Sequence, residues 1–326
     1  MFSTPFLSIV IPCFNEFGNL NALMARLTAV LTDELSDYEI IFVDDGSSDN
    51  TFELITEINS KNKRVCGLAL SRNFGHQIAL AAGLHHSRGK IVITMDGDLQ
   101  HPPEIIPELV SMYQQGFDIV NTLRTDTDGV GRMKKTTSKL FYKILNRLSE
   151  IHLDSGAADF RLMSRKAVDA YAQFDEKDRF TRVLIGWMGF SQAVIKYKAE
   201  SRYAGTSKYT LKRMIHFALD GVTSFSSKPL RIAAYSGIIV SLVGLFYALY
   251  AIIRHFRGDT IQGWTSLLIT VLVLGGVQLL SLGIIGEYIS RIFNESKSRP
   301  LYFIKNTTPL SHLDNEKPTT PQKNQK

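Results

Sequence analysis

The sequence contains little cysteine, and this scarcity excludes two kinds of stabilised site. Cys13 and Cys66 are the only cysteines among 326 residues. They cannot build a disulfide framework, and their separation does not fit zinc-ligand spacing. The run that starts at Leu7 reads directly as a first strand, without a basic region and long apolar core before it. We therefore expect a reducing compartment and no signal peptide.

Two common nucleotide-binding fingerprints are also missing. A dinucleotide site needs Gly-x-Gly-x-x-Gly after the first strand, but residues 12–18 read Pro-Cys-Phe-Asn-Glu-Phe-Gly. The chain has no Gly-x-x-x-x-Gly-Lys-Ser/Thr loop either. These two absences argue against nicotinamide chemistry and against a nucleoside-triphosphate hydrolase.

The positive charge is concentrated in the last part of the chain. Residues 201–326 hold 15 Lys and Arg against 6 Asp and Glu, whereas residues 1–200 hold 22 against 25. The basic excess therefore surrounds two very apolar stretches, although the net charge of the whole chain is only +6. We interpret it as charge at a membrane surface and expect no nucleic-acid partner.

Short apolar runs alternate with helical patterns through the first half of the chain. The predicted strands are residues 7–11, 39–43, 65–70, 90–95 and 118–122, and the predicted helices are 19–35, 51–59, 76–86 and 103–115. Nearly continuous apolar character is typical of strands that are buried on both faces. The alternation predicts an α/β fold, a mostly parallel sheet with helices on both faces. Ligands of such sheets bind beyond the carboxyl ends of the strands.

The motif Asp96-Gly97-Asp98 follows the fourth predicted strand, at the edge where a ligand is expected. Side chains two residues apart on an extended segment point to the same side, so these carboxylates should converge. Gln100 continues the spacing with a neutral oxygen. Such oxygen ligands suit Mg²⁺ or Mn²⁺ shared with phosphates. A simple turn without a metal stays an open alternative, because Asp and Gly are common turn residues.

Two long runs without a charged residue occupy much of the last third of the chain. Residues 232–253 and 264–286 contain 22 and 23 residues. Each exceeds the roughly 20 residues that cross a bilayer core about 30 Å thick. The short linker, residues 254–263, predicts a helical hairpin with both chain ends on one side. Lys and Arg are more numerous on that side than in the linker, which indicates that the side with the chain ends is cytoplasmic.

Several motifs together resemble those of a known family. Residues 12–16, 43–49, 71–75 and 96–103 look like the motifs of family 2 glycosyltransferases with a GT-A fold. Residues 159–163 and 202–209 resemble the polyprenyl-phosphate glycosyltransferases within that family, a group that includes dolichol-phosphate mannose synthase and bactoprenol glucosyltransferases. The resemblance covers about residues 5–305, and the two-span ending looks most like the bactoprenol type.

The resemblance implies roles for individual residues. Nucleotide binding is implied for Pro12, Phe14, Glu16, Asp44 and Asp45, metal binding for Asp96, Asp98 and Gln100, and phosphate or acceptor binding for Arg124, Arg132, Arg202, Ser207 and Lys208. In many relatives of this fold, an acidic residue near Asp159 serves as the base. Here Asp159 has two other candidate roles, orienting the acceptor or holding a basic partner such as Arg161.

The expected reaction is inverting, metal-dependent transfer of a hexose, best glucose from UDP-glucose, to polyprenyl phosphate. A phosphate monoester needs no general base, because its second pKa is about 6 and it is largely dianionic at pH 7. GDP-mannose or a UDP-aminosugar as donor stays open. A processive synthase is disfavoured because its Gln-x-x-Arg-Trp motif is missing, and an inactive membrane scaffold is disfavoured by the intact Asp96, Asp98 and Gln100 set.

These inferences divide the chain into four parts. Residues 1–209 are predicted to form a cytoplasmic GT-A domain and residues 210–230 an amphipathic helix in the membrane interface. Residues 231–290 would hold the two spans, and residues 291–326 a cytoplasmic tail that is largely disordered after 306. An ordinary surface helix is the alternative for residues 210–230. We expect a multi-pass protein of the cell membrane, and its homo-oligomerisation stays open.

Overall fold

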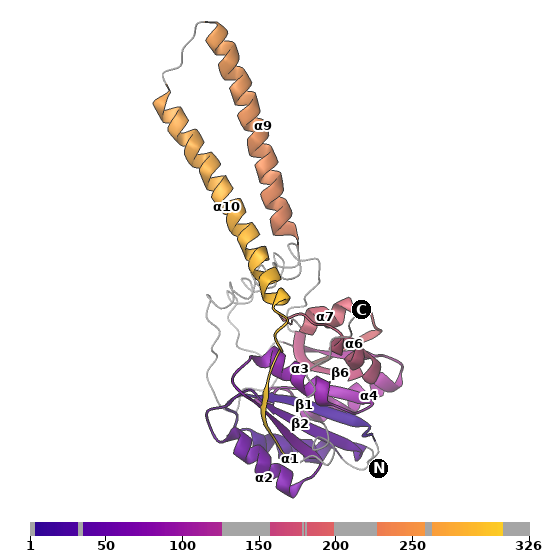
Figure 1. Cartoon of the computed structure of the whole chain (residues 1–326). Helices are drawn as coiled ribbons and strands as arrows, with labels where there is room; N and C mark the ends of the chain where they lie inside the picture. The colour runs from indigo at the N-terminus through magenta and orange to yellow at the C-terminus, as the bar shows by residue number, and fades with distance from the viewer. Residues whose placement is uncertain are drawn as a thin grey trace, which may run out of the picture. The chain divides into compact units, whose positions relative to one another are not determined.

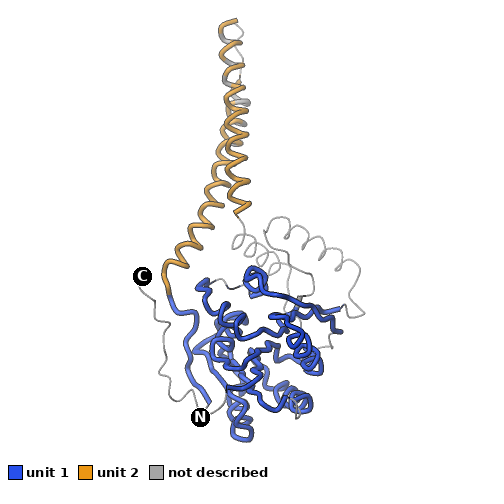
Figure 2. The backbone as a smooth tube through the Cα atoms, turned by 90° about the vertical axis from the view of Figure 1, so that its right-hand side faces the viewer, with its two compact units in different colours: residues 1–139, 153–208, 299–326 blue, residues 140–152, 209–298 orange. Residues whose placement is uncertain are grey.

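The chain forms two compact units. The computed structural model describes residues 4–31, 35–125, 157–177, 179, 181–198, 227–257 and 263–308. The first unit comprises residues 1–139, 153–208 and 299–326, and the second comprises residues 140–152 and 209–298 (Figure 2). Each unit is described by itself below.

One mixed sheet forms the centre of the first unit (Figure 1). Its strands are β1 (Leu7–Cys13), β2 (Tyr38–Asp44), β3 (Val65–Leu70), β4 (Ile91–Thr94), β5 (Ile119–Thr125), β6 (Ala157–Ser164), β7 (Gln192–Lys198) and β8 (Ile304–Thr307). The strand order is β7-β5-β6-β4-β1-β2-β3-β8. Strand β6 is antiparallel to β4 and β5, and β8 is antiparallel to β3, whereas the remaining pairs are parallel. The mostly parallel sheet predicted from the sequence is therefore confirmed.

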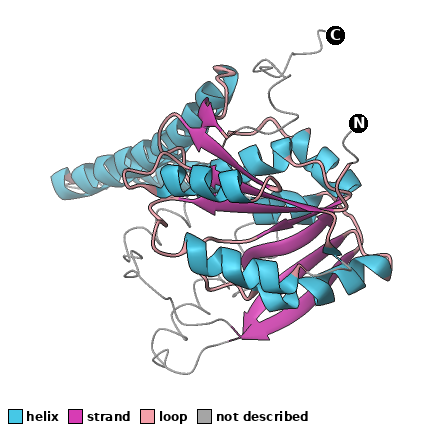
Figure 3. Cartoon of the chain, turned by 90° about the horizontal axis from the view of Figure 1, so that it is seen from below, coloured by secondary structure: helices cyan, strands magenta, loops and turns pink. Residues whose placement is uncertain are grey.

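Helices cover both faces of this sheet (Figure 3). They are α1 (Leu20–Val30), α2 (Thr51–Lys61), α3 (His76–His86), the short 3₁₀ helix η2 (Pro103–Ile105), α4 (Ile106–Gln114), α6 (Arg165–Ala172) and α7 (Thr181–Trp187). Helices on both faces explain the apolar runs in the sequence, because every residue of β1 to β4 is buried and none faces water.

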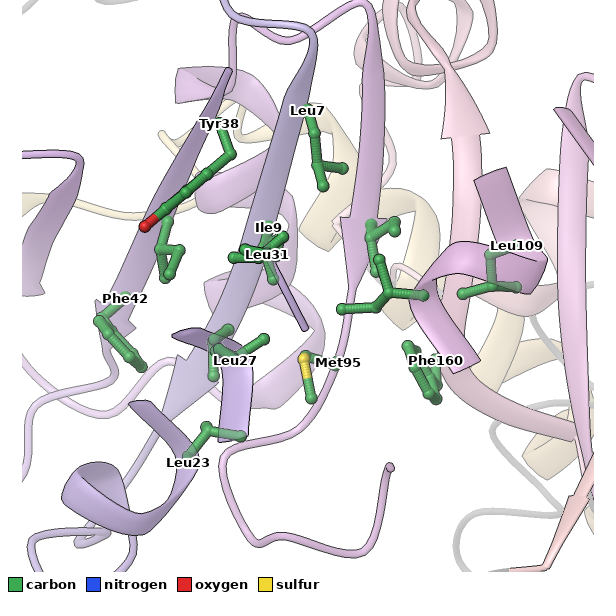
Figure 4. Close-up of a cluster of buried hydrophobic side chains, with 14 of the residues drawn as sticks. Leu7, Ile9, Leu23, Leu27, Leu31, Tyr38, Phe42, Met95, Leu109 and Phe160 are labelled. Atoms are coloured by element: carbon green, nitrogen blue, oxygen red, sulfur yellow. The ribbon is translucent and has the colours of Figure 1, made fainter. Parts of the chain in front are cut away.

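The hydrophobic core lies between the sheet and its covering helices (Figure 4). Leu23 and Leu27, one turn apart on α1, are fully buried with Ile9 of β1 and Phe42 of β2. Burial of each such side chain contributes about 1.5–3 kcal/mol. Phe160 of β6 belongs to the same core, so this packing also anchors the strand that carries Asp159.

Strand β8 lies within the segment that the sequence analysis treats as a tail. The second unit's last helix continues to Ser296, and residues 304–307 add an edge strand to the sheet. The Thr308 N–H donates to the Gly67 carbonyl at 3.0 Å, and the Gly67 N–H donates to Thr308 Oγ1 at 2.8 Å. Backbone pairing holds this strand, and its mostly exposed polar side chains carry no apolar pattern that would predict it.

The described part of the second unit contains two long helices, α9 (Lys228–Phe256) and α10 (Trp264–Ser296), that pack against each other. Segments Lys228–Arg254 and Val273–Ser296 are long and apolar enough to cross a membrane. Large apolar side chains such as Phe246 and Leu279 are exposed, and an apolar surface of this extent is unfavourable in water. These features indicate membrane association. Residues 210–226 of the predicted interfacial helix lie outside the described residues.

Candidate active site

The ends of β1, β2 and β4 meet at the carboxyl edge of the sheet, as predicted. The Asp45 N–H donates to the Cys13 carbonyl at 2.8 Å, which joins the turns after β1 and β2. A Cβ atom added to Gly97 would lie 3.3 Å from Cys13 Sγ and 3.6 Å from the Pro12 carbonyl oxygen. The aspartate turn after β4 therefore packs directly on the end of β1, where glycine permits this approach.

Two buried carboxylates organise the turn after β2. Asp44 accepts from the Ser47 N–H at 3.1 Å, and Asp45 accepts from the Phe74 and Gly75 N–H groups at 2.7 and 2.9 Å. Burial raises the pKa of both Asp44 and Asp45, although these hydrogen bonds oppose the shift. Both oxygens of Asp45 are thus engaged by backbone amides, so this side chain holds the 71–75 loop against the sheet edge.

The turn after β1 presents an aromatic ring. Asn15 adopts a left-handed backbone with φ 57°, and its side-chain oxygen accepts from the Ser48 N–H at 2.8 Å. Phe14, next to it, is 41% exposed. Glu16 accepts from the Asn19 amide at 2.5 Å. This arrangement leaves the Phe14 ring as an open face that a nucleoside base can stack on.

The aspartate motif forms a turn, which corrects the extended spacing assumed from the sequence. Strand β4 ends at Thr94, and Leu99 has a left-handed backbone with φ 62°. Asp98 Oδ1 accepts from the Gln100 N–H at 3.1 Å, and Gln100 Oε1 accepts from Arg124 Nη1 at 3.3 Å. The Gln100 oxygen proposed as a metal ligand therefore faces a guanidinium in this structure.

Asp96 lies between two histidines. Its N–H donates to His101 Nδ1 at 3.0 Å, so the proton of a neutral His101 ring resides on Nε2, 3.6 Å from Asp96 Oδ2. Asp96 Oδ1 lies 3.4 Å from His76 Nε2, yet this buried oxygen has no hydrogen-bond partner. Within the described ranges, no three His, Cys, Asp or Glu side chains cluster as a ready metal site. The orphaned oxygen of Asp96 nevertheless fits a hard cation that keeps most of its positions for phosphate and water.

Asp159 is buried on β6 among cationic and amide donors. Oδ1 lies 3.0 Å from Arg161 Nη2 and 2.9 Å from Arg182 Nε, while Oδ2 lies 3.2 Å from Arg182 Nη2 and 3.1 Å from Gln77 Nε2. Burial raises the pKa of Asp159, but His76, Arg182 and Arg161 outweigh it and hold the pKa well below its usual range. A carboxylate in this state does not take up a proton at neutral pH.

His76 connects Asp159 with the aspartate turn. It begins α3, directly after Gly75, whose φ of 101° requires glycine. His76 Nε2 lies 3.6 Å from Asp159 Oδ2 and 3.4 Å from Asp96 Oδ1. Desolvation lowers the pKa of His76, but the hydrogen bond that its ring donates to Asp159 and the charge of Asp96 raise it to about 9. His76 is therefore cationic at neutral pH and bridges two carboxylates.

Tyr197 of β7 belongs to an aromatic cluster beside the aspartate turn. Its ring packs edge-on against His101 and Phe160, which stack on each other at 5.1 Å. Burial and the charges of Asp96 and Asp98 together raise the pKa of Tyr197 to about 12, although the charges of Arg124 and Arg182 oppose this shift. The Tyr197 hydroxyl is therefore neutral at neutral pH.

The structure brings the predicted residues together only in part. Pro12, Phe14, Glu16, Asp44, Asp45, Asp96, Asp98, Gln100, Arg124 and Asp159 all belong to the first unit, at or beside this edge. Arg132, Arg202, Ser207 and Lys208 lie outside the described residues. Sequence reasoning missed His76, Gln77, Arg182 and Tyr197, and it gave His101 no role. His76 directly follows a recognised motif and His101 lies within one, which was an available signal, whereas Arg182 and Tyr197 had none.

Comparison with known proteins decides the family. The model of "Glycosyl transferase family 2" matches residues 8–172, a segment that contains the β1, β2, β4 and β6 site residues. The chain belongs to glycosyl transferase family 2. A second model, "GtrB C-terminal hairpin", matches residues 228–292, which correspond to α9 and most of α10. The protein is therefore a glycosyltransferase of family 2 with a C-terminal helical hairpin.

Two relatives align with nearly the whole chain. An uncharacterized glycosyltransferase of Synechocystis sp. is 44% identical over 95% of this chain and 98% of its own length. A bactoprenol glucosyl transferase of Shigella phage SfV is 39% identical over 92% of this chain and 98% of its own. Among solved structures, glucosyl-3-phosphoglycerate synthase of Mycobacterium tuberculosis aligns with a TM-score of 0.45 and 20% identity, over 68% of this chain and 79% of that one.

Proposed function

We propose that this family 2 enzyme transfers glucose from UDP-glucose to the phosphate of a polyprenyl phosphate lipid. The observation that carries the proposal is the 39% identity with a bactoprenol glucosyl transferase across catalytic domain and hairpin together, 98% of that protein's length. The apolar helices α9 and α10 suit a lipid acceptor that stays in the bilayer. We place the catalytic domain on the cytoplasmic side of a cell membrane, because Lys and Arg are in excess at the hairpin's open end.

The chemistry is a single displacement at the sugar anomeric carbon. An oxygen of the lipid phosphate forms the new bond to C1, the bond from C1 to the nucleoside diphosphate breaks, and the configuration inverts. The acceptor phosphate is already largely dianionic at pH 7, so no residue must remove a proton. The deeply ionised, fully paired state of Asp159 agrees with a mechanism without a general base.

Residues of the sheet edge bind the donor. Phe14, Glu16 and Asp44 would hold the nucleoside, and Arg124 would contact the diphosphate. Asp96 and Asp98 would hold Mg²⁺ or Mn²⁺, which supplies electrostatic stabilisation of the departing diphosphate. Gln100 could join them only if its oxygen left Arg124 Nη1, which it now accepts from at 3.3 Å. Arg132, Arg202, Ser207 and Lys208 remain proposed acceptor ligands.

The test uses membranes that contain the full-length protein and added undecaprenyl phosphate. Radiolabelled UDP-glucose, GDP-mannose and UDP-N-acetylglucosamine are supplied separately, with and without EDTA. We expect one labelled lipid, from UDP-glucose, which disappears with EDTA and returns with Mg²⁺ or Mn²⁺. Label from another nucleotide sugar would change the donor assignment, and no labelled lipid from any donor would refute the function.

A pair of variants tests the aspartate turn in the same assay. Asp98→Asn should abolish transfer, because it removes a carboxylate from the proposed cation site. Asp169→Asn is the matched control, since Asp169 is 63% exposed, pairs with Arg165 at 3.5 Å on the surface and takes no part in the site. Equal activity of the two variants would contradict the metal assignment.

A further inference from the structure

Arg182 holds Asp159 through one edge of its guanidinium. Its Nε and Nη2 lie 2.9 and 3.2 Å from the two carboxylate oxygens, a side-on pairing that fixes the plane of the group. Arginine has five N–H donors in a rigid fork, so this pairing presents the rest of the fork in a defined direction. About a third of the Arg182 side chain, 34%, is exposed. The side chain is therefore both oriented and accessible.

A second arginine pairs with the same carboxylate. Arg161, only 3% exposed, already pairs with Asp159 at 3.0 Å from within the core. Burial lowers the pKa of Arg161, the charge of Asp159 raises it, and the charge of Arg182 lowers it again. The two guanidinium groups therefore repel each other around one carboxylate. Two guanidinium groups held on one carboxylate make this region favourable for an anionic ligand.

Arg182 lies close to the reaction centre. His76 Nε2 lies within 3.6 Å of both Asp159 and Asp96. Arg182, which pairs with Asp159, is therefore connected to the aspartate turn through Asp159 and His76. Arg124 reaches the same turn separately, through Gln100.

We propose that Arg182, oriented by Asp159, binds the phosphate of the lipid acceptor. This inference rests on the proposed function. In an inverting displacement the entering phosphate and the departing diphosphate lie on opposite sides of the sugar C1, so each requires its own cation. Arg124 and the metal-binding aspartates serve the departing group, whereas Arg182 projects from a separate carboxylate. A guanidinium matches a phosphate monoester in geometry and charge, and holding it in line with C1 accelerates the attack.

The balance of the step needs no further reactant. The acceptor phosphate supplies the electron pair for the new C1–O bond, and the nucleoside diphosphate leaves with the pair of the broken bond. No proton moves at Arg182, which stays cationic throughout. Its contribution is binding and alignment of the dianion.

The test compares Arg182→Gln with Lys196→Gln in the full-length protein in membranes. Lys196 is the matched control because it is exposed on β7, next to Tyr197 but on the opposite face of the strand. KM and kcat are measured separately for undecaprenyl phosphate and for UDP-glucose. We expect Arg182→Gln to raise the KM for undecaprenyl phosphate at least about tenfold, the loss for a charged hydrogen bond. The KM for UDP-glucose should change less than twofold, and Lys196→Gln should match the wild type.

Each other outcome has a defined meaning. A raised KM for UDP-glucose with unchanged acceptor KM would assign Arg182 to the donor diphosphate and overturn the proposal, as would no change in either. If Arg182→Gln does not fold, Arg182→Lys replaces it, and a wild-type acceptor KM in that variant overturns the proposal because lysine cannot reproduce the fork. Absence of labelled lipid from the wild type would instead refute the proposed function, before any variant is compared.

Discussion

Asp159→Asn separates an anchoring role from a role as general base. The substitution keeps the shape of the side chain and removes its charge, which leaves Arg161 buried without a counter-ion. Removal of one partner from a buried ion pair costs about 3–5 kcal/mol. Asparagine can still accept one hydrogen bond, so we take the lower end, about 3 kcal/mol. For a domain of this size that loss corresponds to a decrease in Tm of about 6–12 °C.

The assay is thermal unfolding followed by circular dichroism, with kcat measured below the transition. Asp169→Asn is the control, because Asp169 pairs with Arg165 at 3.5 Å on the surface and is 63% exposed. Its loss should cost less than about 1 kcal/mol. A base would behave differently, since its removal lowers kcat about 10²–10⁴-fold without destabilising the fold.

The pH dependence supplies an independent readout. Because the pKa of Asp159 is lowered in the folded protein, its stabilisation is present above its unfolded value near 3.8 and is lost as pH falls through the folded value. Between pH 5 and 8 neither Tm nor rate should show a transition from this residue. Two results together would refute the anchoring role and restore a base. The Tm of Asp159→Asn would be unchanged, and the variant would lack an acidic limb that the wild-type pH–rate profile shows.

Three other substitutions test the frame around the site. Thr308→Val removes the partner of the buried Gly67 N–H and should destabilise the fold by about 1–3 kcal/mol, whereas Thr307→Val at an exposed position should be neutral in the same unfolding assay. Glu39→Gln weakens the hydrogen bonds to Ser8 and Arg88 at the opposite end of the sheet; it should cost about 1.5–3 kcal/mol and leave the KM for UDP-glucose unchanged, and a raised KM would contradict this separation. Gly46→Ala places a Cβ 2.5 Å from the backbone carbonyl carbon of residue 72 at φ 68°, so it should displace the 71–75 loop and raise that KM; an unchanged KM would show that the loop does not position the donor.

Local patterns were sufficient for much of the sheet. The runs that became β1 to β4 are nearly continuous in apolar residues because helices cover both faces, and this burial is visible in the sequence itself. The predicted second span ended at residue 286, but α10 continues to Ser296, since helical periodicity does not stop where apolar character fades. Strands β6 and β8 were not predicted, because both are antiparallel additions whose positions depend on distant partners.

The sequence by itself determined the α/β class, the carboxyl edge as the candidate site, the aspartate motif and the apolar hairpin, because each follows from local periodicity and residue type. Only the tertiary structure decided the partners of the charged groups. It turned Gln100 towards Arg124, brought His76 between two carboxylates and paired Asp159 with two arginines. The physical reason is that the protonation and pairing of a buried charged group depend on the groups that neighbouring elements place within about 4 Å of it. Spacing along the sequence does not specify those neighbours.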